Sequence, residues 1–316
     1  MTRSATVYGE ADGKATKAQR RLMADPRLSL GIPVYNGVAA GLESLLASLV
    51  GGSFGDFELL VSDNASTDGS DEMINEFARA DPRVRAFLLP ANQGVTANFN
   101  RVLFESSAPL FKWCAVGDVV DEGYLSTMVE CMTRSDNLVF AHCRYDFFDG
   151  TVRHSRGSHR RRVFDEAIVR GVEFGSPLLR VRANLNHFGY GGHTHGVLRT
   201  PLLLKLGGLD NHACSDRVIT SEMLALGKGH FFPDVMWSCY APSEEVDYAE
   251  YGLRDGADLP SIELELLRRK SWRQGASSTT RALLVAYLVS RRQADVAKYY
   301  GRRIRQAVRT HLLTRG

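Results

Sequence analysis

The chain has few cysteines, and none of them belongs to a paired motif. Five are scattered along the 316 residues without a Cys-x-x-Cys spacing: Cys114, Cys131, Cys143, Cys214 and Cys239. An odd number of cysteines excludes a complete set of intramolecular disulfides. We therefore expect a protein of a reducing, cytoplasmic compartment.

Long apolar runs and a dominant charge are also missing. Residues 1–21 are polar and charged where a signal peptide would need an apolar stretch, and no later run is long enough to cross a bilayer. The formal net charge is only +3, so no excess of one sign calls for a nucleic acid as partner. We expect no nucleic-acid binding and a cytoplasmic location.

The sequence does contain enough apolar residues, 44% of the total, to bury a full core. From Leu28 onward, short apolar runs alternate with amphipathic stretches, which is typical of strands and helices around a parallel sheet. The pattern predicts strands at 28–35, 84–90 and 138–148, a strand that runs into a loop within 57–66, and a strand at 109–118 that ends in an acidic loop. It predicts helices at 38–52, 70–81 and 98–107. We therefore predict an α/β fold whose first half is doubly wound.

The second half of the chain is less regular. Its pattern predicts a strand and then a helix within 191–210, and a further helix, closed by glycine, within 215–234. Residues 151–164 are basic and lack apolar periodicity, so we expect a mobile loop there.

The tail has an apolar residue at every fourth position and arginines on the opposite face, which predicts an amphipathic helix. The apolar residues are Val296, Tyr300, Ile304, Val308 and Leu312, and the arginines are Arg302, Arg303, Arg305 and Arg309. Such a helix packs on its own chain or on a partner, or it rests on an anionic membrane. Peripheral membrane contact through this basic C-terminal helix and oligomer formation therefore both stay open.

Polar side chains gather where the second and fourth predicted strands end, and ligands of open parallel sheets bind at that edge. After the second strand come Asp63, Asn64, Ser66, Thr67 and Asp68. They would accept hydrogen bonds from a ligand, or they form a turn with a helix cap. Asp118 would hold Mg²⁺ or Mn²⁺ against a diphosphate, or it caps a helix that begins near Gly123.

Two further positions have a structural and a functional interpretation each. Asp216 lies at the start of a predicted helix, where a carboxylate serves as a cap or as a general base. His193 and His195 would lie on one face of a predicted strand, in a pocket or as metal ligands. A metal role needs a third ligand that the sequence does not identify.

Four segments, IPVYNG, SDNASTDGS, NQGVTANFN and FKWCAVGDVVDEGYL, occur in an order and spacing that resemble glycosyltransferase family 2. HGVLRTPLLLKLGGLD and SDRVITSEMLALGKGHFFPD are similar to the acceptor-side half of that family. The resemblance implies a GT-A fold with a Rossmann-like nucleotide-binding core, a mostly parallel sheet flanked by helices, and a C-terminal helical segment. It divides the chain into a polar extension (1–26), a nucleotide-sugar half (27–125), an acceptor-binding and catalytic half (126–245) and a helical segment (246–316).

The resemblance also implies residue roles. The positions expected at the nucleotide are Pro33, Val34, Tyr35, Asn36, Asp63, Asn92, Gly94, Asn98 and Gly117, and those expected on the acceptor side are His193, His195 and Trp113. Within the first set, Asp63 would hydrogen-bond the base. Asp118 matches the metal-binding carboxylate of an Asp-x-Asp-type motif, and Asp216 matches the catalytic base.

The match departs from the family at two places. Val116 and Gly117 precede Asp118 where the family has further carboxylates, so a ribose contact would be lost and metal affinity altered. Ser215 precedes Asp216 where the family often has glutamate, which leaves the key aspartate but not its neighbour.

We therefore predict an inverting glycosyltransferase that uses Mg²⁺ or Mn²⁺ and transfers a sugar from a nucleotide sugar, expected to be a UDP-sugar, to a glycan, lipid-linked or small-molecule acceptor. A degenerate homologue that only binds a nucleotide sugar or a partner protein is an alternative. A sugar-phosphate nucleotidyltransferase would need basic residues in the loop after the first strand, which IPVYNGVAAG lacks. A dehydrogenase would need Gly-x-Gly-x-x-Gly there.

Overall fold

The computed structural model describes residues 25–148, 153–154, 170–186, 192–212, 214–240, 262–269, 271–291 and 293. Residues 1–24 of the predicted N-terminal extension, the amphipathic tail beyond residue 293 and the basic loop 151–164, apart from residues 153–154, lie outside this range. Four cysteines within it, Cys114, Cys131, Cys143 and Cys214, carry free thiols. No helix of the described part is long and apolar enough to cross a membrane.

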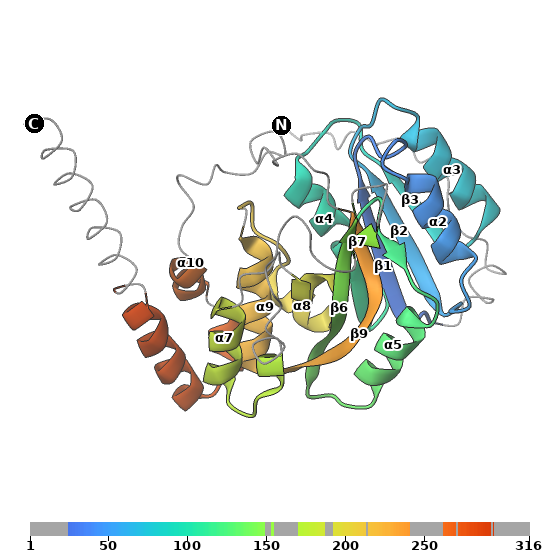
Figure 1. Ribbon diagram of the computed structural model, residues 1–316. Coiled ribbons are helices and arrows are strands. Elements are labelled where there is room, and N and C mark those ends of the chain that lie inside the picture. The colour runs from blue at the N-terminus through green and yellow to red at the C-terminus, as the bar shows by residue number, and fades with distance from the viewer. Residues whose placement is uncertain are drawn as a thin grey trace, which may run out of the picture.

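One mixed sheet organises the described chain, in the strand order β3-β2-β1-β4-β8-β6-β9-β5 with β7 paired to β6 (Figure 1). The strands are β1 (Leu28–Val34), β2 (Phe57–Asp63), β3 (Val84–Leu88), β4 (Leu110–Trp113), β5 (Val119–Val120), β6 (Leu138–Phe148), β7 (Arg153–His154), β8 (Val197–Arg199) and β9 (Lys228–Tyr240). Strands β1 to β4 are mutually parallel, as are β6 and β9. Strand β8 runs antiparallel to β4 and β6, and so joins the two parallel parts.

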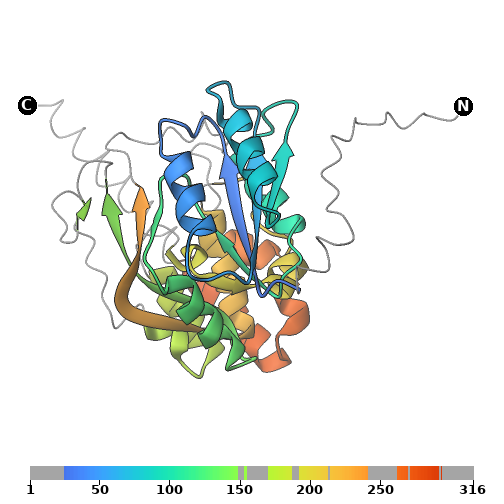
Figure 2. The ribbon, with the colours of Figure 1, turned by 90° about the vertical axis from the view of Figure 1, so that its right-hand side faces the viewer.

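Helices cover both faces of the sheet (Figures 1 and 2). The α-helices are α2 (Leu42–Val50), α3 (Ser70–Ala80), α4 (Val95–Phe104), α5 (Tyr124–Thr133), α7 (Pro177–Asn186), α8 (Thr200–Leu206), α9 (Ser215–Leu226), α10 (Ile262–Arg268), α11 (Ser271–Gly275) and a helix over 278–291. Two short 3-10 helices, η1 (Arg170–Glu173) and η2 (Gly192–His195), complete the set. Alternating strands and helices of this kind confirm the α/β prediction.

The sheet separates two hydrophobic cores. Strand β1 is buried along its whole length, as expected of a central parallel strand, and its alternate residues from Leu28 to Val34 face the first core. Helix α2 adds the buried stripe Leu42, Leu45, Leu46 and Leu49 to this core. The second core lies against α4, α7, α8 and α9, and it includes Leu266, Trp272, Leu284 and Leu288 of the C-terminal segment.

Several predicted bounds are wrong, and one predicted strand segment is a 3-10 helix; four of these differences have a local reason. The fourth strand ends at Trp113 because residues 115–118 form a turn, in which the Asp118 N–H donates to the Ala115 carbonyl at 3.1 Å. Helix α4 begins at Val95, directly after Gly94. Helix α9 ends at Leu226, and GKGHFFPD continues into β9. His193 and His195 lie in η2, not on a strand, because residues 192–195 close a 3-10 turn before β8.

Candidate functional site

The carboxyl ends of β1, β2 and β4 meet at one edge of the sheet. Strand β1 pairs with β2 so that Val34 lies opposite Asp63, and on its other side Gly31 lies opposite Trp113. The loops that follow these three strands therefore converge, and open parallel sheets bind their ligands at such an edge.

Asp63 ties the loops after β1 and β2 together. Its carboxylate is only 2% exposed and accepts hydrogen bonds from the Ser66 hydroxyl and, at 3.0 Å, from the Ser66 N–H. The Ser66 hydroxyl oxygen in turn accepts the Asn36 N–H at 2.8 Å, and the Asn36 side-chain oxygen accepts the Thr67 N–H at 2.9 Å. Asp63 therefore closes a turn, and it does not cap α3, which begins after Gly69.

Hydrogen bonds from Asn64 hold the loop that contains Asn92 and Gly94. Asn64 accepts the Gln93 N–H at 2.8 Å and donates its amide to the Asn92 side-chain oxygen at 2.9 Å. That oxygen also accepts the Gly94 N–H at 2.8 Å. The sequence placed Asn64 among the candidate ligands, but its contacts are those of a residue that fixes the loop expected to close over a nucleoside.

The base-lining candidates differ in exposure. Pro33 and Val34 are buried, whereas the ring of Tyr35 is 53% exposed and is the side chain of the three that offers a surface to a base. Asn98 is 3% exposed and donates its amide to the Val34 carbonyl at 3.0 Å. Asn98 therefore acts within the protein, where it fixes the end of β1 against α4.

Asp118 lies at the same edge, in the turn between β4 and β5. Its side chain is 4% exposed, and one carboxylate oxygen accepts the Ala115 N–H at 3.0 Å. Helix α5 begins after Gly123 without a side-chain cap, so Asp118 does not cap it. The turn also contains Gly117, whose φ of 88° lies in the region that glycine favours. A single carboxylate beside diphosphate oxygens is a donor set that Mg²⁺ accepts.

On the acceptor side, Asp216 lies in the first turn of α9. Its side chain is partly buried and accepts the N–H of Arg217 at 2.7 Å. Burial raises the pKa of the Asp216 carboxyl above its ordinary value, although the Arg217 N–H and the Arg217 charge partly oppose this shift. A raised pKa makes the carboxylate a stronger base.

Of the three other acceptor-side candidates, the structure describes the side chains of two. The His193 side chain lies outside the described residues. His195 is half-buried, and burial together with the charge of Lys112 lowers its pKa to about 4, so the ring is neutral at physiological pH. Trp113 is 4% exposed and donates its indole N–H to the Phe99 carbonyl at 3.0 Å. An acceptor would have to reach the small part of Trp113 that stays exposed.

Sequence reasoning missed Lys112. This lysine of β4 is fully buried, its ammonium lies 3.5 Å from the ring centroid of Trp237, and it donates to the His195 carbonyl. The same carbonyl accepts the Tyr124 hydroxyl at 3.2 Å. Lys112 thus fixes the 3-10 turn that holds His195. A lysine in an apolar strand gives no sign in the sequence that its charge is buried.

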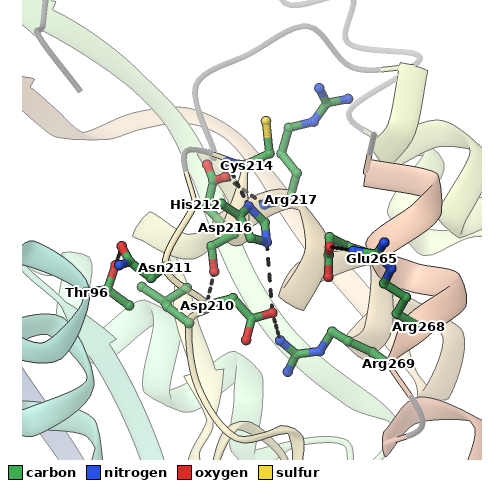
Figure 3. A network of polar contacts seen from close by, with 12 residues as sticks. Thr96, Asp210, Asn211, His212, Cys214, Asp216, Arg217, Glu265, Arg268 and Arg269 are labelled. Atoms are coloured by element: carbon green, nitrogen blue, oxygen red, sulfur yellow. Dashed lines mark hydrogen bonds and ion pairs between the residues drawn. The ribbon is translucent and has the colours of Figure 1, made fainter. Parts of the chain in front are cut away.

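Besides Asp118, a cluster of side chains of the kinds that ligate metals lies near Asp216. One ligand atom each from Asp210, His212 and Glu265 lie within 4.8 Å of one another (Figure 3). Arg269 already pairs with Asp210, and Arg268 pairs with Glu265 at 3.1 Å. Because arginines supply the positive charge at both carboxylates, we assign no metal to this cluster.

Comparison with known proteins identifies the family. Residues 29–202, more than half of the chain, match the model of the family described as Glycosyl transferase family 2. The chain belongs to this family. The matched residues include Asp63, Asn92 and Asp118, whereas Asp216 and the C-terminal segment lie beyond them.

Relatives of known sequence support the family membership over parts of their length. An uncharacterized glycosyltransferase of Haemophilus influenzae is 32% identical over 39% of this chain and 49% of its own. The GalNAc(5)-diNAcBac-PP-undecaprenol beta-1,3-glucosyltransferase of Campylobacter jejuni is 29% identical over 37% of this chain and 38% of its own. The chain thus spans about half or less of the curated relatives that it matches.

Solved structures support the fold. TarS of S. aureus, residues 1–349 in complex with UDP-GlcNAc, has a TM-score of 0.61 at 15% identity, over 83% of this chain and 71% of that one. The mannosyltransferase PcManGT of Pyrobaculum calidifontis, in complex with GDP-Man and Mn²⁺, has a TM-score of 0.51 at 17% identity, over 89% and 81%. At these identities the likeness establishes the GT-A fold of the family.

Proposed function

We propose that this chain is an inverting glycosyltransferase that transfers a sugar from a nucleoside-diphosphate sugar, with a UDP-sugar as the expected donor, to an acceptor hydroxyl. The observation that carries the proposal is the position of Asp118 and Asp216. Asp118 lies at the sheet edge where the nucleotide loops converge, within the part that matches the family. Asp216 lies in the first turn of α9, a helix of the predicted acceptor half.

Each group has a distinct task in a single displacement. Asp216 takes the proton of the acceptor hydroxyl as that oxygen attacks the anomeric carbon, which inverts its configuration. Asp118 would hold Mg²⁺ or Mn²⁺, which supplies positive charge to the departing diphosphate. Tyr35 offers its exposed ring to the base. The hydrogen bonds of Asn64 keep the Asn92–Gly94 loop in place over the nucleoside.

Calorimetric titration tests the donor side. UDP, GDP and dTDP are titrated into the full chain with and without Mn²⁺, and we expect UDP to bind with a requirement for the metal. Asp118→Ala should bind UDP equally with and without Mn²⁺, whereas Asp210→Asn, in the arginine-paired cluster, should keep the metal requirement. A metal requirement lost in Asp210→Asn and kept in Asp118→Ala would reverse the assignment.

Turnover tests the base. Release of the nucleoside diphosphate from a panel of UDP-, GDP- and dTDP-sugars, with water in place of the unknown acceptor, should occur in the wild type. It should fall by about a hundredfold or more in Asp216→Asn, because general-base catalysis contributes factors of this size. UDP affinity should stay within about twofold in that variant, since the substituted side chain is isosteric. Near-normal turnover in Asp216→Asn would remove its role as base. No nucleotide binding at all would favour the degenerate homologue that binds a partner protein.

A further inference from the structure

The acceptor helix α9 contains a fully buried charge that the proposed chemistry does not use. Glu222 lies in the middle of this helix with no exposed surface. A buried carboxylate is costly unless it is paired. Its partner is Arg269, whose Nε lies 2.6 Å from a Glu222 carboxylate oxygen. The pair connects α9 to a residue 47 positions further along the chain, directly after α10.

Arg269 contacts three parts of the acceptor half at once. Besides Glu222, its guanidinium pairs with the Asp210 carboxylate (Figure 3). It also donates to the Leu206 carbonyl at the end of α8. The Arg269 side chain is only 12% exposed, so these contacts are largely shielded from water. A planar guanidinium with several fixed donors suits a site where three acceptors converge.

The loop that Arg269 contacts at Leu206 and Asp210 leads directly to Asp216. The Asp210 N–H donates to the Ser215 hydroxyl at 2.5 Å, and the Ser215 N–H donates to the His212 carbonyl at 3.1 Å. The Cys214 N–H donates to the His212 ring at 3.3 Å. These bonds connect Asp210 and His212 to Cys214 and Ser215, so a displacement of Asp210 is passed to the first turn of α9, where Asp216 lies.

Helix α4 holds the loop from the opposite side. Asn100 accepts the Leu209 N–H and donates to the Leu209 carbonyl, both at 2.8 Å. Gly208 lies so close that a Cβ there would come within 2.4 Å of the Asn100 side-chain oxygen. The loop is therefore fixed between α4 of the nucleotide half and Arg269 of the C-terminal segment.

We propose that Arg269 is a positioning residue that, through Asp210 and Glu222, holds the loop 206–216 in the geometry that Asp216 needs to act on the acceptor. The inference rests on the proposed function, because it assumes that Asp216 is the base. It assigns to the C-terminal segment, which lies beyond the residues that match the family, a part in the reaction.

Three variants of the full chain separate positioning from stability. Arg269→Gln removes the guanidinium and with it a charged partner of the buried Glu222, so it also lowers stability. Glu222→Gln combined with Arg269→Gln removes both charges and should keep the stability of the fold. Arg269→Lys keeps the positive charge but loses the planar set of donors of the guanidinium. Arg268→Gln is the matched control, because Arg268 is 63% exposed and pairs only with Glu265 among these residues.

The readouts are the amide exchange of Cys214, Ser215 and Arg217, the affinity for UDP with Mn²⁺, and kcat and KM for release of UDP from UDP-glucose and UDP-GlcNAc. In the double variant we expect faster exchange at these amides and kcat lower by about ten- to a hundredfold, since small displacements of catalytic groups have such effects. Arg269→Lys should recover part of kcat. KM, UDP affinity and the control should stay within about twofold of wild type.

The outcomes distinguish this inference from the proposed function. If the wild type turns over and the double variant keeps its kcat, or if the three amides exchange as in wild type, Arg269 does not position the loop. If the wild type releases no nucleotide from any of the sugars, the proposed function itself fails, and the catalytic part of the inference falls with it.

Discussion

Three aspartates carry the proposed site, and each one is held by a different kind of contact. Asp63 is bound by the N–H and hydroxyl of Ser66, and Asp118 by the N–H of Ala115. Asp216 accepts the N–H of its own neighbour, Arg217, and lies where burial raises its pKa. In the proposed function the first two belong to the donor side, and the third takes the proton of the acceptor.

The pKa of Asp216 predicts how activity depends on pH. Burial raises this pKa above the ordinary 3.8, and the Arg217 charge lowers it in part. The base must be deprotonated, so kcat/KM falls as the pH drops through the raised pKa. Arg217→Gln removes the opposing charge, and we expect the acid limb of its kcat/KM profile to move to higher pH, with a rate at the plateau within about threefold of wild type.

Arg217→Lys is the control for that experiment. It keeps the positive charge next to Asp216, so its acid limb should stay at the wild-type position. An acid limb at the same pH in all three proteins would show that a group other than Asp216 controls the rate.

Residue types at strand ends could be predicted from the sequence, but the partners of buried charges could not. Asp63, Asn92 and Asp118 follow apolar runs, so their place at the sheet edge follows from the fold class. Lys112 and Glu222 are of residue types that usually lie on the surface. Their partners are 83 and 47 positions away, at His195 and Arg269, and no local pattern encodes contacts of that range.

Elements whose apolar residues follow one regular strand or helix period could be predicted from the sequence. Elements whose pattern is interrupted could not. Strand β1 and helix α2 are set by a continuous apolar run and by a leucine stripe. Strand β9 spans 13 residues but contains Gly229 and Pro233, which interrupt the strand pattern, and the sequence assigned its start to the preceding helix. Pairing with β6, which only the folded sheet provides, decides this element.

Four elements are joined by one carboxylate at the edge of the sheet opposite the site. Glu58 of β2 is 3% exposed and accepts the hydroxyl of Ser29 of β1 at 2.6 Å. It also accepts the N–H of Ser107, just before β4, at 2.6 Å and pairs with Arg85 of β3 at 3.1 Å. Burial alone would raise the pKa of Glu58, but these bonds outweigh it and the pKa is lowered.

Glu58→Gln should therefore destabilise the sheet in a way that depends on pH. At neutral pH we expect the free energy of unfolding in urea to fall by about 1–3 kcal/mol, because buried donors lose a charged acceptor. The carboxylate stabilises the fold above its unfolded pKa of 4.5, and this contribution is lost as the pH falls through the lower folded pKa. The difference between variant and wild type should shrink in acid.

Glu105→Gln provides the comparison, since Glu105 also pairs with Arg85 but its side chain is 34% exposed. Its effect should stay within about 0.5 kcal/mol. A loss of stability in Glu58→Gln that is equal at neutral and acid pH would mean that side-chain packing, and not the charge, accounts for it.

At the scale of the whole molecule, the halves assigned from sequence share one sheet. Strand β4 of the predicted nucleotide half pairs with β8 of the predicted acceptor half, so the boundary predicted near residue 125 does not separate two sheets. The C-terminal helical segment shares a core with the rest of the chain. Its residues Leu266, Trp272, Leu284 and Leu288 belong to the second core, together with α9.

Trp272 tests whether this segment belongs to the same cooperative unit. It is 1% exposed, and its indole N–H donates to the Leu266 carbonyl at 2.9 Å. Trp272→Ala should lower the free energy of unfolding by about 3–5 kcal/mol, since a buried aromatic is replaced by a cavity. Unfolding should remain a single transition, because the cavity opens in a core shared with α9.

Leu283→Ala is the control in the neighbouring helix, where the side chain is 51% exposed and its loss should change stability by at most about 0.5 kcal/mol. If Trp272→Ala instead unfolds in two steps, with the first releasing only the C-terminal helices, the segment is a separate unit. Arg269 would then hold the acceptor loop from an element that detaches on its own, and loss of the segment should cost turnover before it costs UDP affinity.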